Sequence, residues 1–335
     1  MVAKRQGFTL VELLVTVTII GILAAAVTAG LVVARQAARV ATTKATIAKI
    51  NLILAAKWEA YETRRLPMSN TWPLAPGLSE MAQVAYDKMG WIPTDPAAPE
   101  KSFDARCYAV VRLAAIRDLV RMEMPERIAD IQEAPVFFPI AGAGPDPWGA
   151  FVPPGVWVSY RTRYLNSDGT PKSPSQHPSA EMLYMILCNS PEAYREVKFG
   201  PSEVGDTDGN GFNEFLDGWG RPIYFLRWAP GFTDSDIQSG DAASDPDPLD
   251  GRRAANQQER ADPNAFRLMP LVYSAGPDGA YGLWQDFASG SGVYKWNNST
   301  YTAFSDPDLG MNVLVGMPIG TGHFDNIHNH RSDMR

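Results

Sequence analysis

The stretch Gly7-Phe8-Thr9-Leu10-Val11-Glu12 opens an apolar run that continues to Val33. Glu12 is the one charged residue between Phe8 and Val33, and Lys4 and Arg5 precede the run. About twenty apolar residues are enough to cross a bilayer. Basic residues before such a run orient the N-terminus toward the cytoplasm. The sequence therefore predicts a single-pass membrane segment with the rest of the chain outside the cytoplasm.

Glu12 is unusual because it lies inside this apolar run. A carboxylate at the centre of a membrane helix costs about 2.5–3.5 kcal/mol on insertion scales, so such residues usually have a function. One interpretation is that Glu12 meets a cation during assembly. The alternative is a plain signal anchor in which Glu12 lies near the interface and stays hydrated.

A short basic leader followed by Gly-Phe-Thr-Leu-Val-Glu resembles the prepilin signal of type IV pilins and type II secretion pseudopilins. The resemblance implies cleavage between Gly7 and Phe8 by prepilin peptidase, followed by N-methylation of Phe8. It also implies that Glu12 pairs with the N-terminal amine of a neighbouring subunit. A cation beside the carboxylate would offset the cost of placing it in the membrane.

Composition restricts the remaining functions. The net charge is −7, which argues against nucleic-acid binding because that depends on basic patches. The chain has 27 prolines and 28 glycines, so we expect a loop-rich globular part. Cys107 and Cys188 are the two cysteines. An extracytoplasmic location permits a disulfide between them, and two buried thiols are the alternative.

Residues 8 to about 63 are expected to form one long helix. Beyond the membrane run, apolar side chains recur on one helical face, at Val40, Ile47, Ile50, Leu54, Trp58 and Tyr61. Pro67 is expected to end the helix. The predicted domains are a leader (1–7), a transmembrane and assembly helix (8–33), an outer half-helix (34–65) and a globular head (66–335). This pattern predicts an α+β, pilin-like fold, with the long helix packed on an antiparallel sheet and an enlarged, loop-rich head.

Several shorter elements are expected in the head. Residues 78–89 and 180–197 are predicted helices, and residues 114–131 are a helix that Pro125 kinks or divides. Residues 108–113 are either a strand or the start of that helix. Residues 135–174 are predicted to be loops.

An acidic stretch, residues 206–217, resembles a calcium loop in its spacing. Oxygen-bearing side chains stand at positions one, three and five, a glycine at position six and an acid at position twelve. Calcium loops use this pattern because a hard cation needs oxygen ligands and the glycine permits a sharp turn. The candidate ligands are Asp206, Asp208, Asn210, Phe212 through its carbonyl, Glu214 and Asp217. The residues after Pro222 predict a strand, so the stretch is not an EF-hand. A solvated loop of Asx turns is the alternative to a calcium site.

The C-terminal part, residues 200–335, resembles the type II secretion major pseudopilin in its Trp-Gly-x-Pro and Ser-x-Gly-x-Asp-Gly turns. Independently of this resemblance, residues 222–228 and 270–275 are predicted strands that could pair antiparallel. The resemblance suggests Ser274, Asp278 and Asp325 as further calcium ligands. Residues 229–267 and the region 66–200 are additions to the compact family pattern.

Two further segments are expected to lie outside the core. Residues 241–264 predict a mobile surface loop. The C-terminal tail carries His323, His328 and His330, and we expect a polar tail there, with a metal site as the alternative.

These features favour a structural subunit of a type II secretion pseudopilus or a type IV pilus-like filament. Its implied partners are other pilin-like subunits, prepilin peptidase, an inner-membrane assembly platform and the membrane itself. The head would be periplasmic, or extracellular within a filament. The alternative is a pilin-anchored adhesin or ligand-binding tip protein. No hydrolase, zinc-protease or phosphate-binding motif points to an enzyme.

Overall fold

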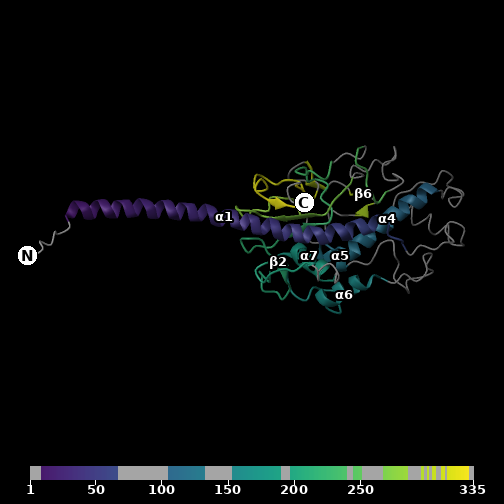
Figure 1. Cartoon of the computed structure of the whole chain (residues 1–335). Helices are drawn as coiled ribbons and strands as arrows, with labels where there is room; N and C mark the ends of the chain where they lie inside the picture. The colour runs from purple at the N-terminus through teal and green to yellow at the C-terminus, as the bar shows by residue number, and fades with distance from the viewer. Residues whose placement is uncertain are drawn as a thin grey trace, which may run out of the picture.

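One long helix projects from a mixed head in the computed structural model (Figure 1). The structure describes residues 9–66, 105–132, 153–189, 197–239, 244–250, 267–285 and 315–331, together with four short strands between residues 296 and 313. The predicted helix over 78–89 lies outside these residues, as does most of the predicted loop over 241–264. The Cys107 side chain also lies outside them, so the choice between a disulfide with Cys188 and two thiols is untested.

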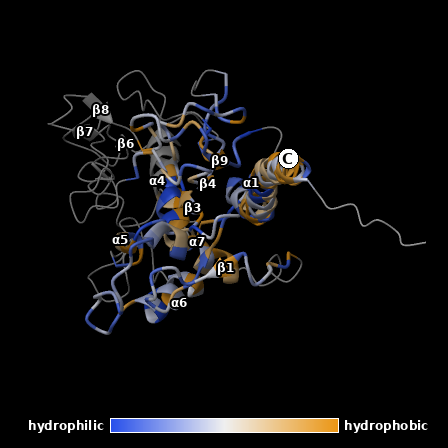
Figure 2. Ribbon diagram, turned by 90° about the vertical axis from the view of Figure 1, so that its left-hand side faces the viewer, coloured by the Kyte–Doolittle hydropathy of each residue, from blue (hydrophilic) through white to orange (hydrophobic). Residues whose placement is uncertain are grey.

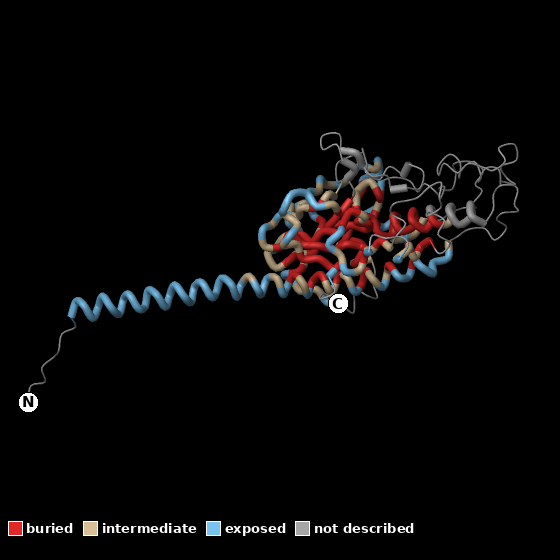
Figure 3. Tube along the Cα trace, turned by 90° about the horizontal axis from the view of Figure 1, so that it is seen from above, coloured by how far each residue is buried: buried red, intermediate tan, exposed pale blue. Residues whose placement is uncertain are grey.

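Helix α1 (Leu10–Glu62) runs without interruption for 53 residues, as the apolar pattern predicts. Its first half is exposed along its length and its second half enters the head (Figure 3). The apolar side chains predicted to share one face of the helix form its buried face. Ile47, Ile50, Leu54, Trp58 and Tyr61 are all buried. The helix ends before Pro67, as expected.

Four further helices are described, α4 (Ala105–Glu123), α5 (Ile128–Gln132), α6 (Gly155–Tyr164) and α7 (Pro178–Cys188). Residues 108–113 therefore belong to a helix, and Pro125 lies in the corner between α4 and α5. The expectation of loops over 135–174 is wrong for α6. That helix forms because its aromatic side chains Trp157, Tyr160 and Tyr164 are buried in the core.

The central sheet is antiparallel and has three strands, in the order β3 (Tyr224–Leu226), β4 (Leu271–Ser274) and β9 (Ile327–His328). Phe225 is opposite Val272, and Tyr273 is opposite His328. The predicted pairing of the first two strands is confirmed. The expected polar tail is wrong in part, because His328 and His330 are buried.

The other strands of the described residues form three two-stranded antiparallel sheets. These pair β1 (Val204–Gly205) with β2 (Glu214–Phe215), β5 (Trp296–Asn297) with β6 (Thr300–Tyr301), and β7 (Phe304–Asp306) with β8 (Met311–Val313). The expected single sheet is thus a set of small sheets.

The core lies between the outer half of α1, the central sheet and α7. Helix α1 contacts β4 and β9, while α7 contacts β2 and β3. Viewed along α1, most of the head lies to one side of the helix (Figure 2). The architecture is α+β and pilin-like, with a long N-terminal helix packed on small antiparallel sheets.

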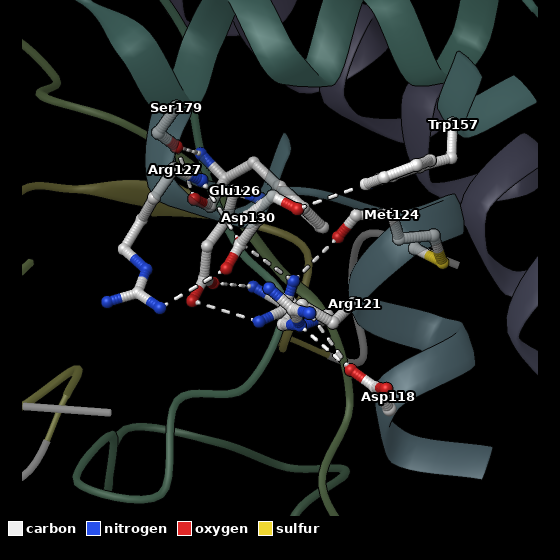
Figure 4. A network of polar contacts seen from close by, with 10 residues as sticks. Asp118, Arg121, Met124, Glu126, Arg127, Asp130, Trp157 and Ser179 are labelled. Atoms are coloured by element: carbon white, nitrogen blue, oxygen red, sulfur yellow. Dashed lines mark hydrogen bonds and ion pairs between the residues drawn. The ribbon is translucent and has the colours of Figure 1, made fainter. Parts of the chain in front are cut away.

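A buried ionic network fixes the corner between α4 and α5 to the central sheet (Figure 4). Arg227, directly after β3, donates to Asp130 Oδ2 and to the Met124 carbonyl, both at 3.0 Å. Its backbone N–H donates to Glu126 Oε2 at 2.5 Å. Burial alone would raise the pKa of Asp130, but Arg227 and Arg127 hold it well below its usual range. The network therefore compensates two buried carboxylates.

Candidate functional sites

The first candidate site is the inner half of α1, residues 10–33. Its large apolar side chains are exposed, from Leu10 at 81 % to Val33 at 70 %. Among the described helices, α1 alone is long and apolar enough to cross a membrane. An apolar surface of this extent indicates contact with lipid or with other protein.

Glu12 lies at the start of this helix and caps it. Its Oε2 accepts hydrogen bonds from the backbone N–H of Thr9 at 2.8 Å and from the Thr9 hydroxyl at 2.9 Å. In return, the Glu12 N–H donates to Thr9 Oγ1 at 3.2 Å. This reciprocal pair is a capping box. A carboxylate at this end of the helix also interacts favourably with the helix dipole. Gly7 and Phe8 lie outside the described residues.

The second candidate site is a group of three acids, Glu181, Asp208 and Glu214. One carboxylate oxygen from each lies within 4.8 Å of the other two. Helix α7 supplies Glu181, the predicted acidic loop supplies Asp208 and strand β2 supplies Glu214. This buried cluster can hold a metal ion. The sequence identifies Asp208 and Glu214 as candidates, but it does not identify Glu181.

Glu214 and Glu181 are both fully buried, and Glu214 is the less satisfied of the two. Its Oε2 accepts a hydrogen bond from the Thr207 N–H at 3.0 Å. Its Oε1 is buried and has no donor among the described residues. Burial, reinforced by the neighbouring carboxylates, raises the pKa of Glu214 to about 7. The site therefore favours a bound cation, either a proton or a metal.

Neutral donors surround the other two acids. Glu181 accepts from the Tyr164 hydroxyl at 2.5 Å, and from the Ser175 hydroxyl. Nδ2 of Asn210 donates to Glu181 Oε1 at 2.7 Å and to Asp208 Oδ2 at 3.1 Å. None of the ion pairs among the described residues involves an acid of this group.

The remaining residues of the acidic loop lie differently. Asp206 accepts from the backbone N–H groups of Gly209, Asn210 and Gly211, and these bonds lower its pKa. This is the Asx-turn arrangement that the sequence allowed as the alternative to a calcium site. The Phe212 ring stacks on Tyr164, with ring centroids 4.4 Å apart.

Asp217 lies away from the acidic group and organises the turn before β3. It accepts from the backbone N–H groups of Trp219 and Arg221 at 2.8 and 2.9 Å, and from the Ser274 hydroxyl at 2.7 Å. Two members of the predicted ligand set, Asp217 and Ser274, thus meet each other and join this turn to β4.

Asp278, in the loop that follows β4, and Asp325, just before β9, are brought together. The Asp278 N–H donates to Asp325 Oδ2 at 3.0 Å, and Asp278 Oδ1 accepts from the Ala280 N–H at 2.8 Å. Asp325 Oδ1 is buried without a donor among the described residues. The ligand roles predicted for these residues stay proposals.

Comparison with known proteins bears on the first site. A family model, the prokaryotic N-terminal methylation motif, matches residues 2–28. The chain therefore carries the N-terminal methylation motif of the type IV pilin and type II pseudopilin superfamily. Pilin-like proteins of this kind are generally non-enzymatic. No curated protein and no solved structure matches the chain.

Proposed function

We propose that this chain is a structural subunit of a type II secretion pseudopilus or a type IV pilus-like filament. The observation that carries the proposal is the apolar half of α1, which leaves the head with its side chains exposed. Exposed apolar surface is unfavourable in water. Lipid can cover this half-helix before assembly, and equivalent helices of other subunits can cover it afterwards.

Maturation follows from the motif that overlaps this half-helix. Prepilin peptidase cuts between Gly7 and Phe8 on the cytoplasmic side of the inner membrane and methylates Phe8. An inner-membrane assembly platform then receives the mature chain. The head is periplasmic, and becomes extracellular if the filament extends beyond the cell.

Glu12 is the residue to which we assign subunit recognition. In the single chain its carboxylate is bonded to Thr9 at the exposed end of α1. Removal of residues 1–7 creates a free amine at Phe8. In the filament, Glu12 of one subunit pairs with the Phe8 amine of a neighbour, which satisfies a charge inside an apolar environment.

The test is the substitution Glu12→Ala, with Glu59→Ala as the matched control on the exposed outer part of the same helix. Both variants should insert into the membrane and be cleaved. We expect Glu12→Ala to be absent from the sheared filament fraction and Glu59→Ala to be present at the wild-type level. Normal incorporation of Glu12→Ala would contradict the proposed role.

Calcium is the metal that we propose for the acidic group. Its ligands would be carboxylate oxygens, and hard cations such as calcium prefer oxygen donors. The location of the ion within the fold is argued in the next subsection.

A further inference from the structure

We infer that Glu181, Asp208 and Glu214 form a divalent-cation site that connects α7, the acidic loop and β2. This inference deepens the calcium proposal and is independent of the filament role. The site differs from the predicted loop in its composition, because Glu181 comes from a helix and Asp206 and Asp217 take no part. It is also separate from the pair formed by Asp278, after β4, and Asp325, before β9.

The first argument is the electrostatics of Glu214. Its carboxylate is fully buried, faces two other carboxylates and leaves Oε1 without a donor among the described residues. An unpartnered buried anion is costly unless a cation compensates it. No lysine or arginine of the described residues pairs with these acids. A bound cation is the partner that the arrangement lacks.

The second argument is the geometry of the ligand oxygens. Those of the three acids lie within 4.8 Å of one another. Calcium binds oxygens at about 2.4 Å, so oxygens on opposite sides of the ion are about 5 Å apart. The three acids can therefore surround one ion without movement of the backbone. Asn210, which donates to Glu181 and Asp208, lies at the edge of this space.

The third argument is the support behind each ligand. Thr207 N–H holds Glu214 Oε2, Gln176 N–H holds Asp208 Oδ2 at 2.8 Å, and the Tyr164 hydroxyl holds Glu181 Oε2. Outer hydrogen bonds of this kind orient metal ligands before the ion arrives. Bound calcium would thus connect α7 to the acidic stretch that carries Asp208 and Glu214, 27 residues or more further along the chain.

The experiment uses the full chain in detergent, stripped with a chelator and titrated with calcium chloride by calorimetry. We expect one site with a Kd of about 10⁻⁴–10⁻³ M or tighter, the range of extracellular calcium modules. Saturating calcium should also raise the Tm by roughly 5 °C. Glu214→Gln keeps the shape of the side chain and should weaken binding at least tenfold.

Two further variants make the outcome decisive. Asp208→Asn lies at a half-buried position, so it tests the site even if Glu214→Gln fails to fold. It should also weaken binding at least tenfold, whereas Asp278→Asn should bind as the wild type does. The inference is overturned if wild-type protein binds no calcium up to 10 mM, a limit about tenfold above the expected range. It is equally overturned if Asp278→Asn alone loses binding. Neither result bears on filament assembly, which the Glu12 variant tests separately.

Discussion

The backbone N–H of Gly218 donates a hydrogen bond to Thr43 Oγ1 at 2.9 Å, joining two residues that are 175 positions apart. Beside it, Trp219 Nε1 donates to Gln36 Oε1 at 3.3 Å. The turn that Asp217 organises therefore packs directly against α1, at the point where the helix leaves the head. This contact fixes the position of the head relative to the projecting half of the helix.

Gly218→Ala should destabilise the head. A Cβ at residue 218 would lie 2.3 Å from the Arg39 carbonyl oxygen, and this helical backbone cannot move away freely. We expect a loss of about 1–3 kcal/mol in the free energy of unfolding, as for other overpacked sites. Denaturant unfolding measures the loss. Gly155→Ala is the control, because its Cβ would meet nothing within 4 Å. Equal stability of the two variants would refute the proposed tight contact.

Arg227→Met should be among the most damaging substitutions. It removes the buried guanidinium that pairs with both Glu126 and Asp130, and leaves Asp130 paired with Arg127. Removing one partner of a buried ion pair costs about 3–5 kcal/mol at neutral pH. The cost should shrink as pH falls, because the buried carboxylates that lose the Arg227 charge can then take up protons.

The control for Arg227→Met is Arg331→Met, which removes an exposed pair with Asp234. Exposed pairs contribute about 0–1 kcal/mol. Chemical unfolding of both variants at pH 7 and pH 5 gives the comparison. A loss for Arg227→Met no larger than that for Arg331→Met would show that the buried network does not stabilise the corner.

His330 should make the head sensitive to acid. Burial, with His328 beside it, lowers the pKa of His330 to about 3. The unfolded state takes up a proton near pH 6.5, whereas the folded state does not, so stability is lost as pH falls below about 6.5. The groups that face this pair include Asp234, Asp236 and Arg331.

The expected loss from His330 alone is about 2 kcal/mol between pH 7 and pH 5. Thermal unfolding across this range measures it. Compared with the wild type, His330→Gln should be spared this loss, while Glu214, whose pKa is raised to about 7, acts in the opposite direction in both proteins. His323→Gln, outside the buried pair, should behave as the wild type does. An unchanged slope in His330→Gln would mean that other groups cause the acid sensitivity.

The parts of the fold that are set by local pattern could be predicted. Helix α1 follows from one uninterrupted apolar run and a stripe of helical period, and the pairing of β3 with β4 follows from two apolar segments that end in turns. Helix α6 was not predicted because prolines and glycines flank it, although its buried aromatics Trp157, Tyr160 and Tyr164 recur at helical spacing.

The acidic site shows the same limit. The alternation of acids in the loop indicates Asp208 and Glu214, but only the packing of α7 against β2 brings Glu181 to them. In the sequence, Glu181 stands beside Met182 and Leu183 and resembles an exposed position of an amphipathic helix. Its burial is a tertiary effect, and no local spacing encodes it.

Cross-linking within the apolar half of α1 tests the filament role most directly. If Glu12 meets residue 8 of a neighbour, adjacent helices are offset by four residues. Seven residues further along the same helical face, this offset places residue 19 of one helix beside residue 15 of the other. A chain with Val15→Cys and Ile19→Cys, and with Cys107 and Cys188 replaced by serine, should form an oxidised ladder of multimers. Within one helix, residues four apart are about 5–6 Å apart at Cβ, which disfavours an internal disulfide. The account predicts this ladder in membranes that assemble filaments, and its loss on Glu12→Gln. Monomers alone, or a ladder unchanged by Glu12→Gln, would contradict it.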